Sequence, residues 1–329
     1  MTDALRLHID KSQKALITTH KSPDGDAIGS VVSWYFFLKN LGKEAHVVIP
    51  DRPADFLLPF LKDVDYSIFD QGFHQDITDF DTIYCLDYNG AGRVGKDMES
   101  FVLDFPATKV MIDHHPHPQD FCQITISRPD VCSTAQLIFE CIEEMGYIHQ
   151  LDVAVGNGIY LGMLTDTGSF RFPSVKAKTH EVLAYLLKIG VNHVDIHEAI
   201  YDVNTVSRLQ LRGYAIAEKL ELFPGLPIGL ISLTLEELHR FHYQKGDTEG
   251  LVNVILSIEG ISIAAFFVEH EDGIKISFRS KGKYFVNEFS AKHFMGGGHQ
   301  YAAGGFSNES LTVTIDRFRS LVEELTPVK

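Results

Sequence analysis

The clearest chemical signal in the sequence is a set of histidines and aspartates placed directly after short apolar runs. The first group is His20-x-x-x-Asp24-x-Asp26, in which Gly25 allows the backbone to turn tightly. Two carboxylates and one imidazole at a turn suit a hard or borderline divalent cation such as Mn²⁺ or Mg²⁺. Taken alone, the pattern also fits Asp24 or Asp26 as a cap of the following helix. Both interpretations stay open at this point.

Two further groups end apolar segments in the same way. Asp87 ends the apolar part of TIYCLDYNG, where a carboxylate is costly to bury without a partner such as a metal. A simple turn residue would fit that place equally well. In KVMIDHH, the adjacent His114 and His115 must point in different directions, so one can bind the metal of Asp87 while the other faces a phosphate. Asp113 can accept a hydrogen bond from a neighbouring imidazole and fix its tautomer.

The last group is Asp166, which ends an apolar helical segment and alone would be read as a cap or turn residue. Together the groups supply six metal-type ligands, enough for two ions if one carboxylate bridges. The first ion would take His20, Asp24 and Asp87, and the second Asp26, Asp87, His114 and Asp166. Two ions about 3.5–4 Å apart activate a water and neutralise the attacked phosphate, which is chemistry for phosphoester or phosphoanhydride hydrolysis. No cysteine has the spacing of a sulfur-rich zinc site.

The elements that must position these residues alternate between strand and helix. Apolar runs at 14–19, 45–49, 82–86 and 109–112 predict strands, and the patterns at 26–41, 133–145 and 152–164 predict helices. The alternation predicts an α/β fold with a doubly wound, mainly parallel sheet. Ligands of such sheets bind beyond the carboxyl ends of the strands, where His20, Asp87 and Asp113 fall.

The second half of the chain has a different pattern. Residues 176–222 are predicted to be mostly helical; a strand at 228–233, a hairpin at 261–279, a glycine-rich segment at 295–305 and a helix at 309–325 follow. We therefore predict a catalytic, metal-binding domain at 1–190, a helical linker at 191–222 and a smaller α/β domain at 223–329 that binds substrate. A cleft between the two domains is expected to hold the site.

The composition limits which molecules this protein can bind and in which compartment it is expected. The 329 residues carry a formal charge of −15, which argues against a protein that grips long nucleic acid by its backbone and favours a small anionic substrate. The four cysteines form no CxxC pair, so free, mostly buried thiols are expected. No apolar run is long enough for a membrane span, and the N-terminus lacks the core of a signal peptide. We expect a cytoplasmic protein without a membrane partner.

The motifs together resemble those of the DHH phosphoesterase superfamily. His20-x-x-Pro23-Asp24-Gly25-Asp26, Asp87, Asp113-His114-His115 and Asp166 correspond to its four motifs in order, and Gly296-Gly297-Gly298-His299 is similar to the signature of the DHH-associated substrate domain. The chain is most similar to the nanoRNase group, the bifunctional oligoribonuclease and 3′-phosphoadenosine 5′-phosphate phosphatases. The resemblance implies a Mn²⁺ enzyme that degrades RNA of a few nucleotides to mononucleotides and dephosphorylates that nucleotide. A homodimer is possible, and the sequence does not decide the oligomeric state.

The resemblance also implies roles for single residues. His115 would contact the scissile phosphate, with Asp113 and Asp87 as its catalytic neighbours, and Arg279, Gly297, Gly298 and His299 would hold the phosphate of the nucleotide. Independently, residues 274–299 carry a local charge of +4, the balance of five basic residues against one glutamate. Glycine amides can approach an anion closely. Tyr284 in this segment either stacks on a base or is packed in the core.

Three other functions are compatible with part of this pattern. A linear or cyclic dinucleotide phosphodiesterase would use the same catalytic residues. A family II inorganic pyrophosphatase is disfavoured, because its second domain carries a serine-arginine-lysine motif in place of GGGH. A nucleotide-binding regulator without catalysis is disfavoured, because none of the expected ligands is missing.

Overall fold

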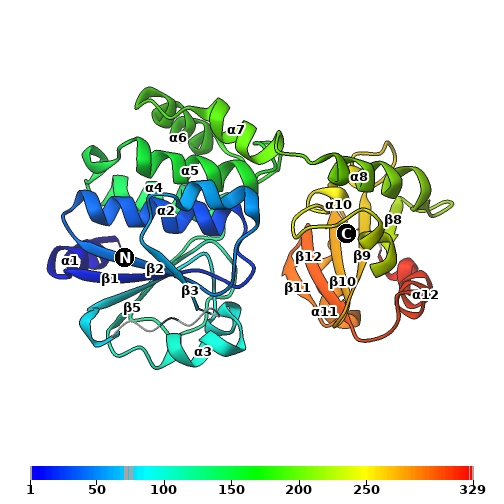
Figure 1. Cartoon of the computed structure of the whole chain (residues 1–329), viewed down its shortest axis with the longest axis horizontal. Helices are drawn as coiled ribbons and strands as arrows, with labels where there is room; N and C mark the ends of the chain where they lie inside the picture. Colours follow the sequence, from blue (N-terminus) through cyan, green and yellow to red (C-terminus); the bar gives the residue numbers. More distant parts are fainter. Residues whose placement is uncertain (1, 70–72, 74–76, 326, 328–329) are drawn as a thin grey trace. The chain divides into compact units, whose positions relative to one another are not determined.

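The structure is a computed structural model that describes residues 2–69, 73, 77–325 and 327 (Figure 1). The chain divides into two compact units, Met1–Val203 and Asn204–Lys329. The first is coloured blue to green in Figure 1 and the second green-yellow to red. In the described part of the chain, no helix has both the length and the apolar character that a membrane crossing requires.

The first unit is built on a six-stranded, entirely parallel sheet with strand order β3-β2-β1-β4-β5-β6. The strands are β1 Lys14–Thr18, β2 Glu44–Ile49, β3 Tyr66–Ile68, β4 Thr82–Leu86, β5 Thr108–Asp113 and β6 Ile124–Ser127. The order reverses between β1 and β4, which are neighbours in the sheet but not in the sequence. In doubly wound sheets this switch point is where ligands bind, at the carboxyl ends of the strands.

Helices cover both faces of this sheet. They are α1 Thr2–Lys11, α2 Gly25–Asn40, α3 Lys96–Leu103, α4 Thr134–Glu144, α5 Val153–Asp166, α6 Ala177–Lys188 and α7 His193–Tyr201, with the short 3₁₀ turns η1 Asp55–Leu61, η3 Ile77–Asp79, η4 Ala91–Val94 and η5 Ile148–Gln150. In Figure 1, α2, α4 and α5 lie on one face and α3 on the other. Neighbouring residues of β1 show the consequence: Ile17 is part of the core under α2, whereas Leu16 is part of the core under α3. A strand buried on both faces must be apolar throughout, which explains why these runs could be read from the sequence.

The second unit is built on a mixed sheet with strand order β11-β12-β10-β9-β8-β7, antiparallel except for the β8–β9 pair. Its strands are β7 Leu220–Leu222, β8 Ile228–Leu233, β9 Ile263–His270, β10 Gly273–Ser280, β11 Gly297–His299 and β12 Ala302–Ser307. Its helices are α8 Val206–Glu218, α9 Leu235–Arg240, α10 Leu251–Leu256, α11 Asn287–His293 and α12 Leu311–Leu321, followed by η6 Val322–Glu324. Separate apolar clusters pack on its two faces.

The predicted fold class is confirmed, with a doubly wound parallel sheet and a second, smaller α/β unit. The predicted helical stretch 176–222 was wrong at its end, because Leu220–Leu222 pairs with β8 as strand β7. The boundary between the units falls between Val203 and Asn204, so the predicted linker, 191–222, contributes α7 to the first unit and α8 to the second. The functional assignment of the domains stays a prediction. The four cysteines are free and buried, as expected.

Candidate metal centre

The predicted ligands of the first unit gather at one edge of its sheet. His20 and Asp24 lie in the segment after β1, Asp87 directly follows β4, and Asp113 is the last residue of β5. These strands are neighbours and run parallel, so their carboxyl ends meet at the same edge. The backbone of Asp87 is left-handed, with φ of 64°, which is uncommon for a residue other than glycine. Such strain is often found at functional sites.

One group of ligand atoms comprises His20, Asp24 and Asp87, all within 4.8 Å of one another. His20 Nε2 is 3.9 Å from Asp24 Oδ1 and 3.5 Å from Asp87 Oδ2. The imidazole Nδ1 lies 2.9 Å from the carbonyl oxygen of Lys21. A carbonyl can only accept, so Nδ1 carries a proton, and Nε2, which faces the two carboxylates, is the nitrogen left to bind a metal. This tautomer is the one a metal-binding histidine needs.

The second group comprises Asp26, Asp87 and His114. His114 Nε2 is 3.9 Å from Asp26 Oδ2 and 3.8 Å from Asp87 Oδ1. It is also 3.6 Å from Oδ2 of Asp166, the last residue of α5. Its Nδ1 lies 3.3 Å from the carbonyl oxygen of Val131, which again leaves Nε2 facing the carboxylates. Asp87 thus belongs to both groups, with Oδ2 toward one histidine and Oδ1 toward the other.

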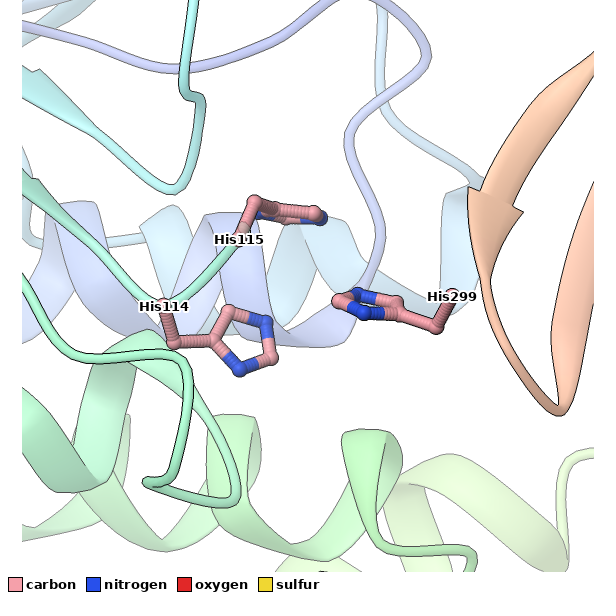
Figure 2. A group of neighbouring side chains, drawn as sticks. All are labelled: His114, His115 and His299. Atoms are coloured by element: carbon pink, nitrogen blue, oxygen red, sulfur yellow. The ribbon is translucent and has the colours of Figure 1, made fainter. Parts of the chain in front are cut away.

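His114 and His115 point in different directions. Figure 2 shows the two rings projecting from the segment after β5, and they are nearly perpendicular, with an interplanar angle of 70°. His115 Nδ1 donates to Asp113 Oδ1 at 2.7 Å, and the His115 amide donates to the other oxygen of Asp113 at 3.1 Å. Asp113 is fully buried. This carboxylate therefore fixes the orientation of the His115 ring and keeps a proton on Nδ1. The other ring nitrogen, Nε2, points away from Asp113.

Of the two residues considered as a cap of the following helix, Asp24 has that role, whereas Asp26 binds the start of another helix. Asp24 Oδ1 accepts from the amides of Asp26 and Ala27 and so caps α2. Asp26 accepts from the amides of Thr134 at 2.7 Å and Ala135 at 3.0 Å, at the positive end of α4. Both bonds to Asp24 go to Oδ1, and each oxygen of Asp26 accepts one of these bonds, so both carboxylates keep lone pairs that can bind a metal.

Burial and repulsion raise the pKa of two carboxyls in the cluster. The pKa of Asp26 lies well above its usual range, because the group is buried and because Asp87 and Asp166 repel its charge. Burial also raises the pKa of Asp166 to about 6, where the nearby His114 opposes the effect and Asp24 and Asp87 add to it. Negative charge is therefore undercompensated here, and a divalent cation would relieve the repulsion.

The pKa of Asp87 is shifted in the opposite direction, below its usual range. Burial favours its neutral acid, but three neighbouring imidazoles outweigh burial and hold the pKa of Asp87 well below its usual range. The three are His20, His115 and His114. Burial lowers the pKa of His20, but its hydrogen bond to Asp87 and the charge of Asp24 prevail and raise it to about 9. Asp87 is therefore the carboxylate of the cluster most firmly held in the charged form.

The donor set fits a hard or borderline divalent cation. Four carboxylates and two imidazoles with accessible Nε2 atoms suit Mn²⁺ or Mg²⁺ better than a thiophilic ion. His20, Asp24 and Asp87 would hold one ion, and Asp26, Asp87, His114 and Asp166 a second. These assignments remain proposals.

Two residues of this region had not been predicted from the sequence. Thr134 is fully buried at the start of α4, and its hydroxyl donates to Asp87 Oδ1 at 2.8 Å. Burial lowers the pKa of His115, but the hydrogen bond to Asp113 and the charges of Asp87 and Asp113 raise it overall. Arg93, on η4, is exposed, and its positive charge opposes that rise, so it lies within electrostatic range of His115. Among the described residues, the Arg93 guanidinium has no hydrogen bond or ion pair. The carbonyl of Arg93 accepts from the amide of Lys21 at 2.8 Å, which ties η4 to the segment after β1.

The four predicted phosphate-binding residues lie in the second unit, on β10 and β11, the two strands that flank β12. Arg279 on β10 is paired with Ala302 on β12, and Ala302 is paired with His299 on β11. Residues directly opposite in an antiparallel pair point to the same face, so Arg279 and His299 flank the small Ala302 on one face. Gly297 and Gly298 are exposed, and a Cβ added at Gly297 would meet nothing within 4 Å. Packing does not require glycine at this position, whereas the close approach of a ligand would.

The comparisons with known proteins agree with this geometry. The model of the DHH family, N-terminal domain, matches residues 14–163, and that of the DHHA1 domain matches residues 230–326. The protein named bifunctional oligoribonuclease and PAP phosphatase NrnA from Thermus thermophilus is 32% identical over 289 residues, which are 88% of this chain and 82% of that protein. The chain belongs to the DHH family. As a DHH protein it is a hydrolase of phosphoesters, and its family depends on metal ions.

Two further relatives cover nearly all of this DHH protein. The protein of the same name from Bacillus subtilis is 26% identical over 294 residues, 88% of either chain. The crystal structure of an exopolyphosphatase-related protein from Bacteroides fragilis superposes with a TM-score of 0.92 at 37% identity, covering 98% of this chain and 95% of that one. Both units are therefore shared with known DHH proteins, and the likeness is not confined to the catalytic motifs.

Proposed function

We propose that this DHH protein hydrolyses RNAs of a few nucleotides to mononucleotides and removes the 3′-phosphate of 3′-phosphoadenosine 5′-phosphate. The relatives from Thermus thermophilus and Bacillus subtilis are named for both activities. The observation that carries the proposal is the position of Asp87, whose two oxygens face His20 and His114 in two separate ligand groups. A shared carboxylate is the feature that a two-ion phosphoesterase requires.

Two divalent ions, for which we propose Mn²⁺, would supply Lewis acidity and an activated water when bound. The protein itself contributes orientation and charge. Because its Nδ1 is hydrogen-bonded to Asp113, His115 can present Nε2 to an oxygen of the phosphate. There it can stabilise the negative charge that develops on that oxygen. Asp26 and Asp87 stay in place through the amides and hydroxyl at the start of α4.

The second unit is proposed to bind the substrate. Its Arg279 can donate two parallel hydrogen bonds to a phosphate, and His299 can donate a third. The amides near Gly297 and Gly298 can approach the same anion without interference from side chains. The local excess of positive charge in 274–299 suits this role within a chain that is acidic overall.

We propose that the protein is located in the cytoplasm. Four free and buried cysteines fit a reducing compartment.

The test is hydrolysis of 5′-phosphorylated RNAs of two to five nucleotides with Mn²⁺, beside 3′-phosphoadenosine 5′-phosphate, pyrophosphate and a cyclic dinucleotide. We expect mononucleotides from the RNAs, release of the 3′-phosphate and no turnover of pyrophosphate. Asp87→Asn should abolish turnover, whereas Asp97→Asn, an exposed carboxylate on α3, should leave it unchanged. Turnover of pyrophosphate or the cyclic dinucleotide alone would show that the substrate assignment is wrong.

A further inference from the structure

The second unit carries a pair of aromatic rings, one exposed and one half-buried, that its core does not explain. Tyr301 lies in the turn between β11 and β12 and is 37% exposed. The ring of Phe285 is edge-on to it, with the centroids 5.4 Å apart at 83°. Among the described residues, neither ring packs against the two apolar clusters of the unit, whereas Tyr284 does. Of the two interpretations of Tyr284, the structure favours packing.

The turn that carries Tyr301 is held firmly to the loop after β10. The amide of Ser280 donates to the carbonyl of Tyr301 at 3.0 Å, and the amide of Val286 donates to that of Gln300 at 2.8 Å. The phenol of Tyr301 donates to the carbonyl of Gly282 at 3.2 Å. These bonds fix the ring before any ligand binds, so little conformational entropy would be lost on binding.

The aromatic pair is next to the proposed phosphate-binding residues. Tyr301 is two residues from His299, and the residue after it, Ala302, is paired with Arg279. Lys283 in the facing loop is exposed and makes no ion pair within the described residues. A nucleotide whose phosphate is held by Arg279 would thus have an aromatic surface and a cation within reach of its base.

We propose that Tyr301, supported by Phe285, is a stacking platform for a nucleobase of the bound substrate. This inference rests on the proposed function of the second unit and names the part of the substrate that this unit recognises besides phosphate. Stacking on an aromatic ring tolerates every base, because each base has a π-face. The platform therefore selects nucleotides from other phosphate esters without selecting a sequence.

The test compares the binding of adenosine 5′-monophosphate and ribose 5-phosphate to the full chain by calorimetry, with a chelator present so that no turnover occurs. The unsubstituted protein should bind the nucleotide about tenfold more tightly, the factor that corresponds to about 1.4 kcal/mol of stacking. Tyr301→Ala should remove that preference and leave the affinity for ribose 5-phosphate unchanged. Tyr301→Phe should keep it, and Tyr201→Ala, which removes an exposed tyrosine of the first unit, should have no effect.

Several results would overturn the proposal: equal affinity of the unsubstituted protein for both ligands, no measurable binding of the nucleotide at millimolar concentration, or an unchanged preference in Tyr301→Ala. An equal loss of both affinities in that variant would show that the turn is merely structural. Because turnover plays no part in this measurement, a base preference without RNA hydrolysis would contradict the proposed function and leave the platform standing.

Discussion

Gly162 on α5 lies directly against the carboxylate of Asp26 on α2: a Cβ at position 162 would come within 2.5 Å of Asp26 Oδ1. The two helices are also close one turn further along α2, where a Cβ at Gly29 would lie 2.7 Å from the amide nitrogen of Gly162. Small residues thus allow α2 and α5 to approach closely. This approach brings Asp26, at the start of one helix, near Asp166, at the end of the other.

Gly162→Ala should therefore disturb the position of the Asp26 carboxylate and so weaken the proposed metal centre. The added methyl group would also lie against the Cβ of Ala135, so it must displace the Asp26 carboxylate, the start of α4 or α5 itself. Overpacking of this kind costs about 1–3 kcal/mol. We expect weaker Mn²⁺ binding in calorimetry and a large loss of turnover. The matched control is Gly213→Ala on exposed α8, where a Cβ meets nothing within 4 Å. That change should stabilise the chain by about 0.5–1 kcal/mol. Unchanged Mn²⁺ affinity in Gly162→Ala would contradict the assignment of Asp26 as a ligand.

Thr134 is expected to act through Asp87. Thr134→Val keeps the shape of the side chain but removes the hydroxyl that donates to Asp87 Oδ1 and accepts from the amide of His114. Loss of such a supporting hydrogen bond lowers metal affinity or activity by about 10–100-fold, and Thr134→Ser should retain both. Thr314→Val provides the control, since Thr314 is a buried threonine of the second unit with one hydroxyl hydrogen bond. If Thr134→Val bound Mn²⁺ and turned over like the unsubstituted chain, the hydroxyl would have no part in holding Asp87.

The location of the candidate site residues at strand ends could be predicted from the sequence, for a physical reason. Parallel strands covered by helices on both faces are apolar throughout, so an aspartate or histidine just beyond the run marks the edge of the sheet. His20, Asp87 and Asp113 were found in this way. The fold class followed from the same runs and the helices between them.

Other features depend on tertiary contacts and could not be predicted. Nothing in the pattern around Thr134 indicates that its hydroxyl meets a carboxylate 47 positions away in the chain. Arg93 is distinguished only by its place near His115 in the folded unit. The short strand Leu220–Leu222 exists because β8 lies beside it, and its residues alone are compatible with a helix. For Asp24, the two interpretations proved compatible, since it caps α2 and lies beside His20.

Arg93 should contribute to phosphate binding. It is an exposed cation beside His115 without an ion pair among the described residues, so it is available to an anionic substrate. Removing one charge-assisted hydrogen bond costs about 1.5–3 kcal/mol, so Arg93→Gln should lower kcat/KM by roughly 10- to 100-fold. Mn²⁺ affinity should not change. Arg317→Gln, an exposed arginine of the second unit that pairs with Glu309, is the control and should have full activity. An Arg93→Gln variant with full kcat/KM would exclude the role.

Bound metal should stabilise the first unit. At a concentration one hundred times its Kd, a ligand adds about 2.7 kcal/mol, which corresponds to about 5–10 °C in Tm for a unit of this size. The single tryptophan, Trp34, is fully buried in the first unit and reports its unfolding by fluorescence. Mn²⁺ should raise this Tm, a chelator should reverse the effect, and Asp87→Asn should lose most of it. A shift in that variant as large as in the unsubstituted chain would show that the stabilising ion binds elsewhere.

The ion pair of Arg128 and Glu144 should make stability depend on pH. Two guanidinium nitrogens donate to the two oxygens of Glu144 at 2.6 and 2.7 Å, and Glu140 lies 3.3 Å from one of them. The hydrogen bond from Arg128 lowers the pKa of Glu144 below its ordinary value of 4.5. A carboxyl whose pKa is lower in the folded state stabilises the fold above its ordinary pKa, and this contribution is lost as the pH falls through the folded value.

Because the side chains are 28% and 37% exposed, the gain at neutral pH is limited to about 1 kcal/mol or less. Urea unfolding followed through Trp34 should therefore find Glu144→Gln less stable than the unsubstituted chain at pH 7. The two should converge as the pH is lowered well below 4.5, because protonation then removes the charge that the variant lacks. Glu44→Gln, an exposed glutamate at the start of β2, should show no such pH-dependent difference. A difference between Glu144→Gln and the unsubstituted chain that stayed constant with pH would assign the effect to packing or hydrogen-bond geometry and not to charge.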